Sequence, residues 1–338
     1  MHLYKSAVVC ATLVMLFLAF FMPIIDYDEL YRFEVAKSVG FSLKYVNSLI
    51  WLPIYQFIIA LLRDLLLLRL FSVFCVVIAS VVVKRVSEVL WSKKVAADTC
   101  VFYVLNPLII LYGSIALPES LTTLLLVTFT YFFSVKKHVL ASFVLCLAVL
   151  TSYTAWVLIP FVLFYAFLKK EKTLVSYVFP IIFLVWWGFV NFQFTNNPLN
   201  FVSLAHFYYV ALTRQLPMFA NTPFSFLLFT VVYPISFTFP FYIYCFRKPK
   251  MVDVYVLSVY FVFSSVVLLV VGQVLGYVFG WARYFIPLIP FILTLGSSST
   301  CNLKHRRLAI IVYFALSLIS TILQVYYIYD FKNQMLNR

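Results

Sequence analysis

Long apolar segments alternate with short polar segments along almost the whole chain. A helix needs about 20 apolar residues to cross a bilayer, and a helix satisfies its own backbone polar groups in lipid. The pattern predicts helices at about 7–25, 65–83, 95–113, 119–135, 139–151, 153–168, 173–190, 224–246, 251–272, 284–299 and 308–328. We therefore expect an all-α fold, a polytopic transmembrane helix bundle with about 11 spanning helices, forming a single transmembrane domain over residues 1–338. The first apolar segment has no small-residue cleavage site, so we expect a retained helix.

The composition supports this class. The chain is 65% hydrophobic and 11% charged, whereas soluble domains carry about 25% charged residues. The formal charge of +14 comes from short basic clusters between apolar segments, a pattern typical of membrane topology that argues against nucleic-acid binding. The six cysteines are scattered, with no Cys-x-x-Cys pair, so we expect neither a disulfide framework nor a zinc site.

The basic clusters predict which ends of the helices face the cytoplasm. The five clusters are Lys84-Arg85 with Lys93-Lys94, Lys136-Lys137-His138, Lys169-Lys170-Glu171-Lys172, Arg247-Lys248-Pro249-Lys250 and Lys304-His305-Arg306-Arg307. Because 139–168 is basic at both ends, it should be a hairpin that turns at the outer surface near 151–154. The short segment 49–62 should be a juxtamembrane or re-entrant outer helix within an external first loop, 26–64, and 191–223 should be a second long external loop.

An acidic motif opens the first external loop. Four of the chain's eleven acidic residues, Asp26, Asp28, Glu29 and Glu34, fall within nine positions. Carboxylates beside a bilayer are costly and often functional, although an ordinary charged loop is an alternative. Such a cluster can act as a general base, bind a divalent cation such as Mg²⁺ or Mn²⁺, or bind a basic ligand. The spacing leaves these alternatives open, and no residue is assigned to a metal.

Two arginines are expected on the same side, each near the start of a helix: Arg69 and Arg283. The planar guanidinium matches phosphate oxygens, although snorkelling to the interface is an alternative reading. Together with the carboxylates they suggest that a lipid-linked phosphate leaves, held by arginine, while a hydroxyl attacks, activated by aspartate. Glu119 is a further candidate on this side, although an acid at a helix start also stabilises the helix dipole.

Several motifs along the chain resemble the GT-C superfamily of integral-membrane glycosyltransferases, which use polyprenyl-phosphate sugars. Asp26-Tyr27-Asp28-Glu29 is similar to the acidic signature of that family's first external loop. The other similar segments, in order, are Trp51-Leu52-Pro53-Ile54-Tyr55, Arg69-Leu70-Phe71-Ser72, Asn106-Pro107, Leu117-Pro118-Glu119-Ser120, Asn196-Asn197-Pro198-Leu199 and Arg283-Tyr284-Phe285-Ile286-Pro287-Leu288-Ile289-Pro290. Their order and shared side carry the resemblance over most of the chain.

The resemblance implies a hexosyltransferase that moves mannose or another hexose, with inversion, from polyprenyl or dolichyl phosphate to a lipid-linked, glycan or protein acceptor. Its implied partners are this donor, the acceptor and membrane lipids. Its implied location is the endoplasmic reticulum membrane or a prokaryotic plasma membrane, with the site on the lumenal or external side. The implied catalytic residues are Asp28 as the base, with Asp26 second, and Glu29. Arg283, Arg69 and Tyr284 would bind the donor phosphate, and Glu34 and Glu119 would contact the acceptor or support the site.

A non-catalytic reading remains as the alternative: a scaffold subunit of a glycosylation complex, or a lipid or solute transporter. A transporter would need polar residues near the middle of several spans, and the sequence offers neither these nor an internal repeat. An enzyme requires Asp28, whereas a scaffold would tolerate its loss.

Overall fold

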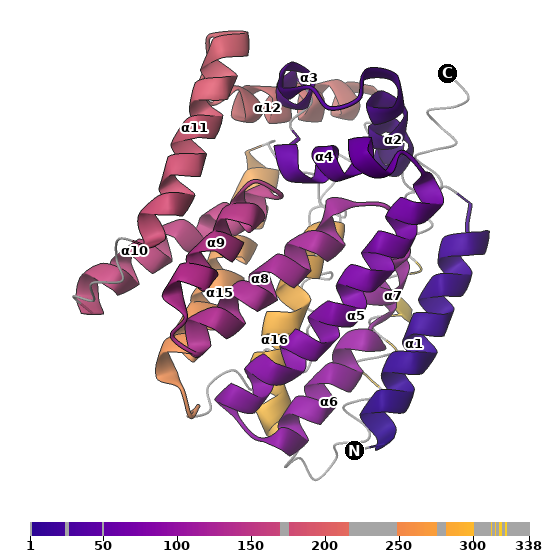
Figure 1. Ribbon diagram of the computed structural model, residues 1–338, viewed down its shortest axis with the longest axis vertical. Coiled ribbons are helices and arrows are strands. Elements are labelled where there is room, and N and C mark those ends of the chain that lie inside the picture. The colour runs from indigo at the N-terminus through magenta and orange to yellow at the C-terminus, as the bar shows by residue number, and fades with distance from the viewer. Residues whose placement is uncertain are drawn as a thin grey trace.

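The computed structural model describes residues 2–23, 27–48, 51–169, 176–215, 249–275 and 282–300, with five isolated helical positions between 312 and 322. Every regular element in these residues is a helix (Figure 1). The expected all-α class is therefore confirmed for the described part of the chain.

The bundle is built around α5 (Leu65–Leu90), which packs against α1 (His2–Phe21), α6 (Lys93–Val104) and α8 (Pro118–Ser134). Its other members are α7 (Pro107–Gly113), α9 (His138–Val149), η1 (Tyr153–Val157), α10 (Leu158–Lys169), α11 (Val178–Thr195), α15 (Val252–Val274), η6 (Ala282–Leu288) and α16 (Ile289–Thr300). One continuous core of buried aliphatic and aromatic side chains runs through these helices.

Four further helices lie across one end of the bundle (Figure 1): α2 (Tyr27–Val39), α3 (Leu43–Ser48), α4 (Pro53–Leu62) and α12 (Asn200–Gln215). We call this the acidic end, because α2 carries the acidic motif. The N-terminus lies at the opposite end. There the backbone N–H of Lys250 donates to the carbonyl of Leu90 at 3.0 Å, so two segments next to basic clusters meet away from the acidic motif.

Four helices among the described residues are long and apolar enough to span a membrane: Tyr4–Phe21, Leu65–Leu90, Val178–Thr195 and Val252–Gly272. A fifth results if α6 and α7 are counted as one broken span. The predicted count of about 11 spans is not confirmed by these helices. The predicted helix 224–246 and nearly all of 308–328 lie outside the described residues.

The predicted continuous helix 95–113 is wrong, because it breaks at Asn106 and Pro107. α6 and α7 meet there at an angle of 58°. Proline lacks a backbone N–H and clashes with the preceding turn. The side-chain oxygen of Asn106 accepts hydrogen bonds from the backbone N–H groups of Leu108, at 2.9 Å, and Ile109, at 3.3 Å. The new helix therefore starts with its first donors satisfied.

The predicted break in 139–168 is confirmed. α9 ends at Val149, and the chain restarts in η1 with the Ser152 hydroxyl accepting from Thr154 N–H at 3.3 Å. The predicted short helix in 49–62 is found as α4, which has proline in its first turn. Its Ile54 N–H donates to the carbonyl of Leu150 at 3.1 Å, so α4 is fixed directly to the turn after α9.

The second predicted external loop is largely helical where it is described. α11 continues to Thr195, and α12 covers 200–215, while the external position of 191–223 stays a prediction. Between them, the Asn197 side chain accepts from Leu199 N–H at 3.0 Å. Phe201 on α12 stacks on Tyr153 with ring centroids 4.7 Å apart. Aromatic packing of this kind holds α12 against η1, a contact that a hydropathy pattern alone does not reveal.

Candidate functional site

The acidic motif is helical, and this decides where its side chains point. Asp28 and Glu29 lie in the first turn of α2, where carboxylates interact favourably with the helix dipole. Residues one apart on a helix are rotated by about 100°, whereas residues four apart share a face. Asp28 and Arg32 therefore lie on one face, and Glu29 is turned toward another. The two consecutive carboxylates accordingly pair with different arginines.

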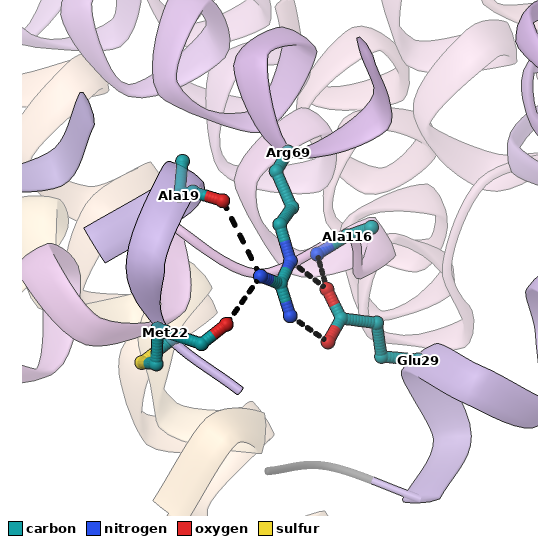
Figure 2. Close-up of polar contacts among 5 residues, drawn as sticks. All are labelled: Ala19, Met22, Glu29, Arg69 and Ala116. Carbon is teal, nitrogen blue, oxygen red and sulfur yellow. Dashed lines mark hydrogen bonds and ion pairs between the residues drawn. The ribbon is translucent and has the colours of Figure 1, made fainter. Parts of the chain in front are cut away.

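Glu29 forms a buried, bidentate ion pair with Arg69 (Figure 2). The Nε and Nη2 atoms of Arg69 each lie 2.8 Å from a carboxylate oxygen of Glu29, and the Ala116 N–H donates to the same carboxylate at 2.8 Å. Arg69 Nη1 also donates to the carbonyls of Met22, at 2.7 Å, and Ala19, at 3.3 Å. The Glu29 side chain is 0% exposed and the Arg69 side chain is 6% exposed.

This pair joins four parts of the chain: the end of α1, the start of α2, the N-terminal part of α5 and the segment before α8. A buried ion pair is tolerated when hydrogen bonds satisfy its remaining donors and acceptors, and the carbonyl and amide contacts here do so. These contacts indicate a structural role for Glu29 and Arg69. The predicted catalytic role of Glu29 and phosphate contact of Arg69 stay predictions.

A second group of charges lies beside this pair, and Arg283 is at its centre. Arg283 Nη2 lies 2.5 Å from the Oδ2 atom of Asp28, and Arg283 Nε lies 3.7 Å from the Oε1 atom of Glu119. The Arg283 side chain is 7% exposed, whereas that of Asp28 is 30% exposed. Arg283 comes from η6, Asp28 from α2 and Glu119 from the first turn of α8. Predicted site residues that are far apart in sequence are thus brought together.

Arg32 completes the group, and the sequence reasoning missed it. Its guanidinium carbon lies 4.6 Å from the ring centroid of Trp51, a cation–π arrangement. Its charge interacts with those of Asp28, Glu119 and Arg283. The sequence signal was the four-residue spacing from Asp28 on one helix. We refer to Asp28, Arg32, Glu119 and Arg283 as the four-charge cluster.

The cluster controls the charge state of Asp28. Burial alone would raise the pKa of Asp28, but the guanidinium groups of Arg283 and Arg32 outweigh it and hold that pKa below its ordinary value of 3.8. Asp28 is therefore ionised at neutral pH. Burial lowers the pKa of Arg32, while Asp28 and Glu119 oppose that shift.

Amide side chains tie the helices around the cluster together. Asn47 on α3 donates to the side-chain oxygen of Asn191 on α11, and Asn200 on α12 donates to Asn47 Oδ1 at 3.1 Å. Asn191 in turn donates to the carbonyl of Pro198 at 3.2 Å. Buried amides with satisfied hydrogen bonds fix one relative position of the elements that carry them. The network therefore holds α3 against α11 and α12 at the acidic end.

The remaining predicted residues are placed as follows. Tyr284 is half-buried, with its ring centroid 5.5 Å from the guanidinium carbon of Arg283. Glu34 is exposed on α2. Asp26 lies outside the described residues.

Among the described residues, no three His, Cys, Asp or Glu side chains come together in a way that could hold a metal ion. Asp28 and Glu119 both face the guanidinium of Arg283, and the charges of Arg283 and Arg32 together balance those of the two carboxylates. Asp28 and Glu119 alone therefore do not form the divalent-cation site that the sequence pattern allowed, and Asp26 lies outside the described residues.

No protein-family model matches the sequence, and no curated protein sequence matches it. Among solved structures, the chain is similar to the crystal structure of the Archaeoglobus fulgidus oligosaccharyltransferase in complex with Zn and sulfate. The similarity has a TM-score of 0.48 and 11% sequence identity, and it covers 96% of this chain and 52% of that chain. This protein thus spans about half the length of that oligosaccharyltransferase.

Proposed function

We propose that this protein is a membrane glycosyltransferase. It moves a hexose, with inversion, from a polyprenyl-phosphate carrier to a lipid-linked, glycan or protein acceptor. The observation that carries this proposal is the meeting of the Asp28 carboxylate and the Arg283 guanidinium at the acidic end of an apolar helix bundle. A base and a phosphate-binding cation are the two groups that such a transfer needs close together.

The proposed reaction uses these groups as follows. The acceptor hydroxyl attacks the anomeric carbon from the face opposite the phosphate, and Asp28 takes the hydroxyl proton. The bond between the anomeric carbon and the phosphate oxygen breaks, and its electron pair stays on that oxygen. Arg283 neutralises the charge that develops on the departing polyprenyl phosphate. Glu119 helps to orient Arg283 through its contact with the Nε atom.

The other candidate residues have supporting roles in this proposal. Glu29 and Arg69 hold the start of α2 against the bundle, which places Asp28. Tyr284 packs beside the Arg283 guanidinium, Glu34 contacts the acceptor from the exposed side of α2, and Asp26 is the second candidate base. The site faces the lumen of the endoplasmic reticulum or the outside of a prokaryotic plasma membrane. No step runs through a metal ion.

The donor class is tested with the full chain purified into liposomes. Labelled polyprenyl-phosphate-mannose and polyprenyl-phosphate-glucose are offered with mixed lipid and glycan acceptors, in parallel with the corresponding nucleotide sugars. We expect transfer from a polyprenyl-phosphate donor and none from a nucleotide sugar. Transfer from the nucleotide sugars alone would contradict the proposed donor, and transfer from neither class would favour a non-catalytic scaffold.

The lowered pKa of Asp28 predicts a flat pH profile on the acid side. A base with a depressed pKa stays ionised until the pH falls below its ordinary value of 3.8. We therefore expect kcat/KM to show no titration of this carboxylate between about pH 5 and 8. Arg283→Gln removes a charge that lowers the pKa of Asp28 but does not change the burial of that carboxylate. The acid limb of the kcat/KM profile should therefore move to higher pH. An acid limb near neutral pH in the wild type would contradict the assignment.

A further inference from the structure

We propose that Arg32 supplies a second guanidinium that binds the donor phosphate, beside Arg283. This inference rests on the proposed function and adds a binding residue to its site. The sequence pattern pointed to Arg69 for this second contact. The structure indicates Arg32 instead, for reasons of hydrogen bonding, charge and rigidity.

Arg69 and Arg32 differ in their hydrogen-bond partners. Arg69 is occupied by both oxygens of Glu29 and by the carbonyls of Ala19 and Met22. A phosphate could reach it only by displacing these contacts. The Nε atom of Arg32 is buried, and it has no hydrogen-bond partner among the described residues. A buried donor without a partner costs free energy, and a phosphate oxygen would remove that cost.

A phosphate that enters the site adds negative charge to the four-charge cluster. The formal charges of the four-charge cluster sum to zero, because it contains two carboxylates and two guanidinium groups that interact with one another. If Arg283 were the only cation, it would have to compensate Asp28, Glu119 and the phosphate together. With Arg32 present, one guanidinium can stay with the carboxylates while the other meets the phosphate. Asp28 can then remain an ionised base in the presence of an anionic donor.

Trp51 restricts the motion of the Arg32 side chain. The Arg32 guanidinium lies over the Trp51 ring, and Trp51 is itself buried in a small aromatic and aliphatic cluster with Leu52 and Trp187. Stacking on a fixed ring reduces the freedom that the arginine side chain would lose on binding a ligand. It also places an indole next to the expected phosphate, so fluorescence can report binding.

The test measures binding of polyprenyl phosphate without a sugar, and so does not depend on transfer. The full chain is placed in nanodiscs of neutral lipid and titrated with polyprenyl phosphate, with neutral polyprenol as the ligand control. Arg32→Gln should weaken binding by about tenfold to a hundredfold, the usual effect of losing a charge-assisted hydrogen bond. Arg32→Lys keeps the charge but not the planar stack, so it should fall between wild type and Arg32→Gln. Arg63→Gln is the matched control, because Arg63 is exposed just after α4, and binding should not change.

The outcomes separate this inference from the proposed function. Wild-type protein that does not bind polyprenyl phosphate would overturn the proposed function. If wild type binds and both Arg32 variants bind equally well, at unchanged melting temperature, the inference about Arg32 is overturned while the proposed function stands. If Arg32→Gln does not fold, the Arg32→Lys variant is the test. Binding of polyprenyl phosphate by Arg32→Lys with wild-type affinity would also overturn the inference about Arg32. Weakened binding in the Arg32 variants but not in Arg63→Gln would support it.

Discussion

Replacing Glu29 by alanine is expected to lower the free energy of unfolding by about 3–5 kcal/mol, the usual cost of removing one partner of a buried ion pair. The Arg69 side chain, 6% exposed when Glu29 is present, would lose its counter-charge. Denaturation of the full chain in detergent measures the loss. Glu34→Ala is the matched control, because Glu34 lies on the same helix but is exposed, and it should change stability by less than about 0.5 kcal/mol.

A double variant distinguishes the ion pair from general disruption of α2. Glu29→Leu combined with Arg69→Met replaces both charges with apolar side chains, which is often neutral for buried pairs. We expect it to regain much of the stability lost in Glu29→Ala, although the Ala116 N–H and the Met22 carbonyl lose their partners. Equal stability of Glu29→Ala and Glu34→Ala would contradict the structural role given to this pair.

The arrangement of the helices was largely predictable where apolar length and charge decide it. The hairpin break in 139–168 followed from basic residues at both ends, and the short helix α4 followed from its length and Pro53. The break at Asn106 was not predicted, because an apolar segment hides a capped proline turn. α12 was also missed, because its packing depends on Tyr153, which is distant in sequence.

The sequence predicted which residues come together in the site, but it did not predict which ion pairs they form. Opposite charges expected on one side of a membrane already suggested that Asp28 and Arg283 belong together. Treating the acidic motif as a loop gave no reason for Asp28 and Glu29 to differ, because the helix of α2 that turns them to different faces was not anticipated. Arg32 was missed for the same reason. On a helix, Arg32 shares a face with Asp28 and therefore belongs to the site. In a loop, nothing would place Arg32 beside Asp28.

Asp28→Asn is expected to lower the rate of transfer by about 10²- to 10⁴-fold, the usual contribution of a general base. Asparagine has nearly the same shape as aspartate but cannot accept a proton, and it places no charge beside Arg283. Binding of polyprenyl phosphate should therefore be retained or become tighter, since the phosphate no longer competes with a carboxylate for that guanidinium. Transfer assays and nanodisc titrations on one preparation measure both effects, with Glu34→Gln as the exposed control.

If the variant transfers sugar at the wild-type rate, the base is another residue, and Asp26 is the next candidate. Lost transfer together with lost phosphate binding would instead mean that Asp28 acts by positioning Arg283.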